Sequence, residues 1–91
     1  MDNAALLVAL KLDLGLSSNA FNGRLIDRIQ TAKERITAEG VTLTDSESDK
    51  DLVVMYAAWL WRSRVTGDGM PRMLRYALNN RVLGQAAGVQ P

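Results

Sequence analysis

The stretch "DLVVMYAAWLWRSR", residues 51–64, decides how this 91-residue chain folds. It is largely apolar, contains neither glycine nor proline, and carries both tryptophans of the chain, Trp59 and Trp61. Each residue of an α-helix turns the chain by about 100°, so positions two apart point about 200° apart. One face of a helix therefore cannot hold both rings, and something else must cover the second.

With Trp59 at the centre of one face, this helix has two apolar stripes. The first is of ordinary core type and consists of Leu52, Val53, Met55, Tyr56 and Leu60. The second sets small residues around one large ring and consists of Val54, Ala57, Ala58, Trp61 and Val65. A helix that is apolar all round is normally buried all round. Leaving a 150–250 Å² indole in water would forgo a few kcal/mol, at about 25 cal/mol per Å².

Two interpretations of the second stripe follow. In the first, Trp59, Tyr56 and Leu52 pack in the subunit core, and a second protein chain covers an interface made of Val54, Ala58, Trp61 and Val65. In the second, the helix is the centre of a compact bundle and the other helices of the same chain wrap it. A chain of this length has a modest core, since it buries only about 60–65% of its unfolded surface, and we therefore favour the first interpretation.

The rest of the chain predicts an all-α fold. Leucines at three- to four-residue spacing indicate a first helix, Pro71 suits the first position of a last helix, and Gly84 is expected to end it. Two pairs at the start of the third helix resemble a capping box, Thr44 with Glu47 and Ser46 with Asp49. The predicted bundle has four helices, at about residues 2–13, 18–39, 46–65 and 71–83. We expect residues 1–84 to form one domain and residues 85–91 to be a flexible tail.

Composition argues against catalysis. The chain has no histidine and no cysteine, so the commonest general base, the commonest metal ligand and any thiolate site are missing. The alternating acids of residues 45–51 do not fit a calcium loop, because Lys50 and Tyr56 stand where an EF-hand needs glycine and glutamate. No apolar run reaches the length of a membrane span. We expect a soluble, unprocessed protein that is not an enzyme and uses no cofactor or metal.

Charge is uneven along the chain. Residues 1–51 carry nine acids and six bases, a net −3, whereas residues 52–91 carry five arginines and one acid, a net +4. The basic half would suit an acidic partner or phosphate, and a solvated face is the alternative. The residues expected to make such contacts are Arg62, Arg64, Arg72, Arg75 and Arg81.

A DNA-binding interpretation is the runner-up. The third and fourth helices could form a helix-turn-helix, with Arg72, Arg75, Tyr76 and Asn79 of the segment 71–83 on one face. Against it, the intervening turn is long and contains Asp68, and the net charge is only +1, whereas DNA-binding domains are usually strongly basic.

The order of elements resembles the small helical head–tail connector proteins of long-tailed bacteriophages, also called adaptor or head-completion proteins. The resemblance covers about residues 4–84. It rests on the patterns of hydrophobic residues and of helix-starting and helix-ending residues in four segments, "AALLVALKLDLG", "RLIDRIQTAKERITAEG", "SDKDLVVMYAAWLWRSR" and "GMPRMLRYALNNRVLG". The chain departs from the pattern in its short C-terminal tail, which puts any tail contact with the portal in doubt.

The resemblance implies a non-enzymatic part of the virion, made in the host cytoplasm and placed at the head–tail interface. Such proteins form a ring, often of about a dozen copies, that docks under the portal, extends the DNA channel and provides a platform for the next connector, stopper or tail protein. The five arginines would then meet a neighbouring copy, the portal or channel DNA. Contact with sliding DNA would be weak and sequence-blind.

Overall fold

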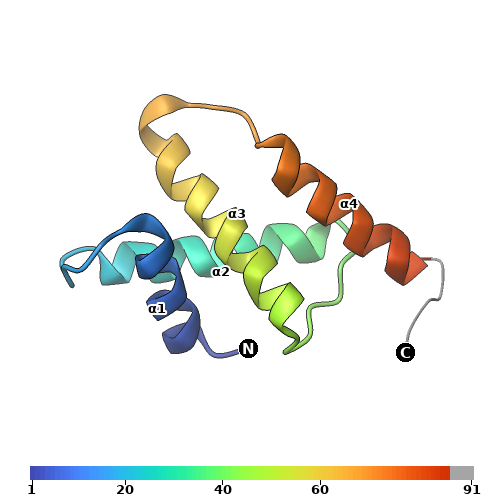
Figure 1. Cartoon of the computed structure of the whole chain (residues 1–91), viewed down its shortest axis with the longest axis horizontal. Helices are drawn as coiled ribbons and strands as arrows, with labels where there is room; N and C mark the ends of the chain where they lie inside the picture. The colour runs from blue at the N-terminus through green and yellow to red at the C-terminus, as the bar shows by residue number, and fades with distance from the viewer. Residues whose placement is uncertain (87–91) are drawn as a thin grey trace.

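The computed structural model describes residues 1–86, which form four α-helices and no strand. The helices are α1 (Asn3–Leu14), α2 (Asn22–Ala38), α3 (Glu47–Thr66) and α4 (Arg72–Ala86). The predicted all-α class and the order of four helices are confirmed (Figure 1). Of the predicted tail at 85–91, the first two residues belong to α4, and residues 87–91 lie outside the described part.

The third helix is the centre of the bundle. It packs against each of the other three helices, and α1 and α2 also pack against each other. In Figure 1, α3 crosses over α2. Helix α1 lies beside the N-terminal half of α3, and α4 descends from the turn that follows the C-terminal end of α3. This arrangement matches the second interpretation of the sequence, in which the other helices of the same chain wrap the central helix.

Local capping chemistry fixes the ends of α1 and α3. The Asp2 carboxylate accepts a hydrogen bond from the backbone N–H of Ala4 at 3.0 Å at the start of α1. Of the two predicted caps of α3 it is Ser46 that acts, accepting from the N–H of Asp49 at 3.2 Å. Gly67 ends α3 at φ +69°, in the left-handed region where side chains are strained.

Two predicted boundaries are wrong. Helix α2 begins at Asn22 and not at 18, because the hydroxyl of Ser18 accepts the N–H of Ala20 in a turn before the helix. Helix α4 does not stop at Gly84 but continues to Ala86. Gly84 does not adopt the positive φ of a C-terminal cap, and a helix tolerates glycine at a cost of about 1 kcal/mol relative to alanine.

The core is assembled from one face of each outer helix and most of α3. The outer helices contribute Leu6 and Leu10 from α1, Leu25, Ile29, Ala32 and Ile36 from α2, and Leu74 and Leu78 from α4. From α3 come Leu52, Val53, Tyr56, Ala57, Ala58, Leu60 and Trp61.

Candidate interaction surfaces

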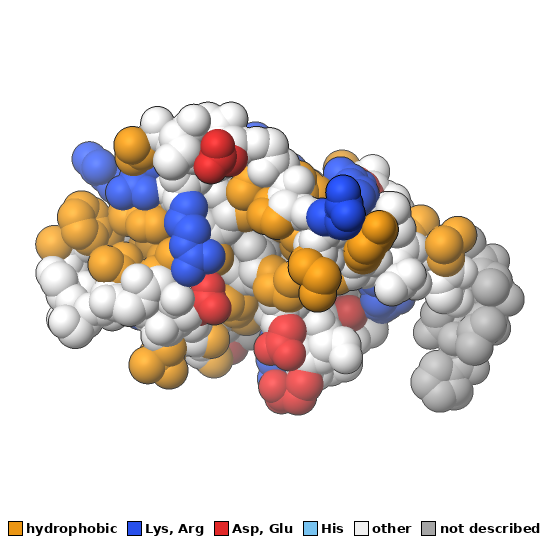
Figure 2. Space-filling view, turned by 45° about the horizontal axis from the view of Figure 1, so that its top comes forward, with side chains coloured by type: hydrophobic (Ala, Val, Ile, Leu, Met, Phe, Trp, Pro, Cys, Tyr) orange, Lys and Arg blue, Asp and Glu red, His pale blue; other side chains and the backbone are white. Residues whose placement is uncertain are grey.

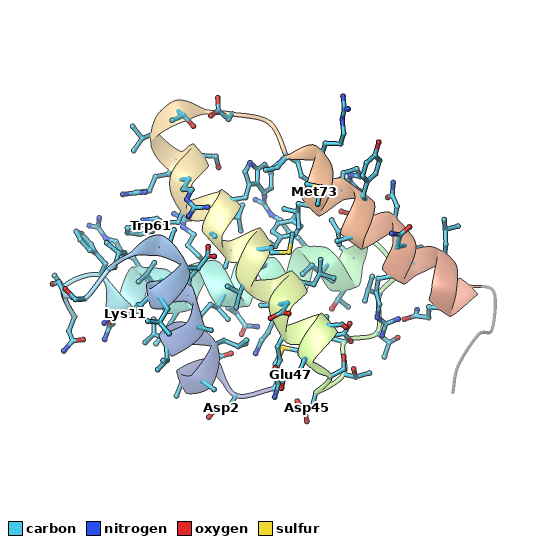
Figure 3. The ribbon with its side chains drawn as sticks, in the orientation of Figure 1. Asp2, Lys11, Asp45, Glu47, Trp61 and Met73 are labelled. Atoms are coloured by element: carbon cyan, nitrogen blue, oxygen red, sulfur yellow. The ribbon has the colours of Figure 1, made fainter. Side chains whose placement is uncertain are left out.

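Trp61 lies inside its own subunit. Its side chain is only 6% exposed, and its ring meets that of Phe21 edge to face, with 5.5 Å between centroids. The guanidinium of Arg64 stacks over the indole at 3.6 Å from the ring centroid, and it also donates to the carbonyl of Trp61. Figure 3 shows Trp61 on the side of α3 that faces the start of α2.

The predicted interface on α3 is therefore wrong for Trp61 and Ala58, which are both buried within the single chain. Val54 is half-buried, and only Val65 is freely exposed, at 79%. The prediction that Trp59 packs in the subunit core also needs correction, since Trp59 is half-buried at the edge of the core. Its indole N–H donates to the carbonyl of Asp68 at 3.2 Å, which ties α3 to the turn before α4.

Four of the five arginines predicted to reach outward have partners in their own chain. Arg62 pairs with Asp13 at 3.6 Å, and Arg75 pairs with Glu39 at 2.6 Å. Arg64 stacks on the indole ring of α3, and Arg81 binds a buried carboxylate described below. Arg72 has no carboxylate partner among residues 1–86, so it is the arginine best placed to meet another molecule.

A polar clamp holds α4 against the start of α3. Asp49 is 1% exposed, and its two carboxylate oxygens accept from Nε of Arg81 at 2.8 Å and from Nη2 at 3.2 Å. The N–H and the hydroxyl of Thr44 each donate to the same carboxylate at 2.8 Å. Burial alone would raise the pKa of Asp49, but the hydrogen bonds from Arg81 and Thr44 outweigh it and hold that pKa below its usual value.

The clamp extends to the segment between α2 and α3. The side-chain oxygen of Gln85 accepts from the N–H of Thr42 at 2.8 Å, and its amide donates to the carbonyl of Gly40 at 2.6 Å. Arg81 donates to the carbonyl of Thr42 at 2.8 Å. Sequence reasoning missed these roles, because it read Asp49 as a capping acid and placed Gln85 in the tail, and no local pattern signals such a contact.

The outer side of α1 carries an exposed apolar stripe, defined here as Val8 and Leu12. Val8 is 61% exposed and Leu12 is 78% exposed. The sequence contains a signal for this stripe, because α1 is apolar on all sides apart from its ends. The interface predicted from the sequence, however, lies on α3. On α4, Met73, Tyr76 and Leu83 are also exposed.

Two hollows flank the central helix. One, of about 430 Å³, lies between α3 and the start of α4 and includes Met55, Trp59 and Met73. The other, of about 570 Å³, is the α1–α3 groove. Its apolar floor and acidic rim comprise Ala5, Leu6, Ala9 and Val54, with Asp2, Asp45, Glu47 and Asp51. In Figure 2, exposed hydrophobic side chains are interspersed with basic and acidic ones.

Within the part of the chain that the structure describes, no group of three or more acidic side chains is placed to hold a metal ion. No described helix is long and apolar enough to cross a membrane. No protein-family model, no curated protein and no solved structure matches the chain. The fold and its surfaces define a small all-α bundle with apolar outer faces on α1 and α4.

Proposed function

We propose that the chain is a structural virion protein, a head–tail connector that forms a ring under the portal, extends the DNA channel and supports the next connector or stopper. In this proposal its partners are further copies of itself, the portal and a downstream stopper or tail protein, and it performs no catalysis. Two things support it: the resemblance in the order and lengths of the helices, and the apolar surface that the fold leaves uncovered.

The observation that carries the proposal is the outer stripe of α1. Val8 and Leu12 lie one helical turn apart, so one partner surface can cover both. Burying such side chains contributes about 1.5–3 kcal/mol each, or about 3–6 kcal/mol together before the cost of association. One copy would bind weakly on that basis, whereas several linked copies would bind tightly to a pre-formed ring.

The arginine geometry bears on the DNA alternative. Arg75 is held by Glu39 and Arg81 by Asp49, so two of the basic side chains on segment 71–83 are neutralised within the fold. Arg72 remains to meet phosphate, which suits weak contact with channel DNA better than base readout.

A matched pair of variants tests the proposal. Leu12→Glu places a charge in the stripe, and Gln30→Glu places the same charge on the exposed side of α2. Both variants should keep the wild-type circular dichroism spectrum. We expect wild type and Gln30→Glu to sediment with a purified portal ring and Leu12→Glu to remain in the supernatant.

The proposal fails if wild type does not bind the portal ring, or if Leu12→Glu binds it as well as Gln30→Glu does. A parallel titration with duplex DNA at several salt concentrations tests the regulator alternative. Tight binding that distinguishes between sequences would support that alternative and contradict the connector.

A further inference from the structure

We propose that the acidic α1–α3 groove of one copy binds the start of α4 of a second copy, head to tail. The inserted surface, here called the α4 patch, consists of Arg72, Met73 and Tyr76. The inference deepens the proposed function. It rests on that function because it assumes that several copies of the chain assemble.

The groove is suited to a cationic, partly apolar ligand. Four acids on its rim face one lysine, Lys50, and the amino group of Met1. Glu47 lies 3.6 Å from Lys50, and Asp45 lies 2.7 Å from the Met1 amino group, which lowers the pKa of Asp45. Asp51 is exposed and has no basic partner among residues 1–86. The rim therefore keeps a net negative charge above a floor of alanine, leucine and valine side chains.

The α4 patch has the complementary chemistry. Arg72 is exposed without a carboxylate partner in the described chain, and Met73 beside it is 73% exposed. One turn further along, Tyr76 exposes its ring. A guanidinium flanked by a flexible thioether and an aromatic ring can pair with carboxylates while its neighbours fill an apolar floor.

These two surfaces do not meet within one subunit. The groove is lined by α1, Asp45 and the start of α3 and by no residue of α4, whereas the α4 patch begins beside the later turns of α3, where Met73 shares a hollow with Met55 and Trp59. Figure 3 shows the separation, with Asp2, Asp45 and Glu47 at the lower end and Met73 toward the upper end. The clamp at Asp49 keeps α4 in this direction.

A second copy is the occupant that the charges favour. Groove against groove would set acids against acids, which costs several kcal/mol, whereas groove against α4 patch pairs opposite charges. The resulting interface is heterologous, so each copy has one groove and one patch to offer.

Charge reversal tests the inference. Asp51→Lys spoils the groove, and Arg72→Glu spoils the α4 patch while adding an acid at a helix start, where it is favourable. Their matched controls on the exposed side of α2 are Glu34→Lys and Arg24→Glu. By sedimentation at low salt and up to millimolar concentration, wild type and both controls should self-associate. Each reversal should weaken association by about tenfold or more.

Mixing the two reversed variants gives the sharpest readout. The intact groove of Arg72→Glu can accept the intact patch of Asp51→Lys, and the reversed groove and patch that remain carry exchanged, opposite charges. The mixture should therefore associate although each variant alone does not. The double variant carries exchanged charges and should associate again. A wild-type chain that stays monomeric at millimolar concentration, or a mixture that associates no better than either variant alone, overturns the inference. If the portal ring still retains wild type but not Leu12→Glu, the proposed function stands without it.

Discussion

Replacing Arg81 by methionine measures how strongly the fold depends on its buried ion pair. The change keeps an unbranched apolar stem but removes the guanidinium, which contacts the carboxylate of Asp49 at 2.8 and 3.2 Å. Removing one partner of a buried pair costs about 3–5 kcal/mol, because a charge is left without compensation. Thr44 keeps donating two hydrogen bonds, so we expect about 3 kcal/mol, against a total of about 5–14 kcal/mol for a chain this size.

Replacing the acidic partner of the pair should cost less stability than replacing Arg81. In Asp49→Asn, the new side chain can still accept hydrogen bonds, and the Arg81 side chain, already 23% exposed, can be hydrated. We expect about 1–2 kcal/mol, as for a hydrogen bond to a charged group that is weakened but not lost. The double variant should cost less than the sum of the two by about 1–2 kcal/mol, since both changes remove the same interaction.

The pH dependence gives the reasoning a second check. In wild type the pKa of Asp49 lies below its unfolded value of 3.8, so the unfolded chain takes up the proton first as the pH falls. The stabilisation is therefore complete above pH 3.8 and is lost as the pH falls through the lower, folded pKa. In Arg81→Met the burial that raises the pKa of Asp49 remains while the lowering effect of Arg81 is lost, so that pKa rises from its wild-type value and protonation relieves part of the penalty.

Urea denaturation followed by circular dichroism at pH 7 and near pH 4 measures these differences. The cost of Arg81→Met should be smaller at the lower pH. A variant within about 0.5 kcal/mol of wild type at pH 7, or a cost that does not change with pH, would refute the clamp as described.

Further predictions concern the central helix and its ends. Trp61→Ala should lower the free energy of unfolding by about 4 kcal/mol and Trp59→Ala by about 2 kcal/mol, because the first indole is buried and the second is half-exposed; urea denaturation compares them. Gly67→Ala should cost about 1 kcal/mol, since its φ of +69° strains a side chain, and a lowered melting temperature would show it. Gly84→Ala should stabilise by up to about 1 kcal/mol and raise helicity by circular dichroism, because nothing lies within 4 Å of the added methyl group.

The helices could be predicted from the sequence because their signals are local. Apolar spacing, Ser46 as a cap and Pro71 just before α4 depend only on neighbouring residues. The faces of α3 could not be predicted in the same way. Centring the helical wheel on Trp59 placed an edge residue in the middle, whereas the buried residues span about 240° of the helix, from Leu52 round to Ala58.

The partners of the charged residues were also beyond the sequence. Asp49 and Arg81 are 32 positions apart, and Glu39 and Arg75 are 36 apart. Such pairs depend on how α4 docks on the rest of the bundle, which no local pattern encodes. The exposed stripe of α1, in contrast, could have been predicted from the sequence. A helix that is apolar all round needs cover on every side, and this argument, which we used for α3, holds for α1 as well.

The central claim is that one chain encloses the middle of α3, including Trp61, so that the surfaces for other molecules lie on α1, on α4 and in the groove at the start of α3. Acrylamide quenching of the dilute subunit tests it through two variants with one tryptophan each, Trp59→Phe and Trp61→Phe. We predict that the fluorescence of Trp61 is shielded at every protein concentration, while that of Trp59 is quenched more readily. If Trp61 is quenched freely in dilute solution and becomes shielded only as the chains associate, then a neighbouring chain covers α3 and the account is wrong.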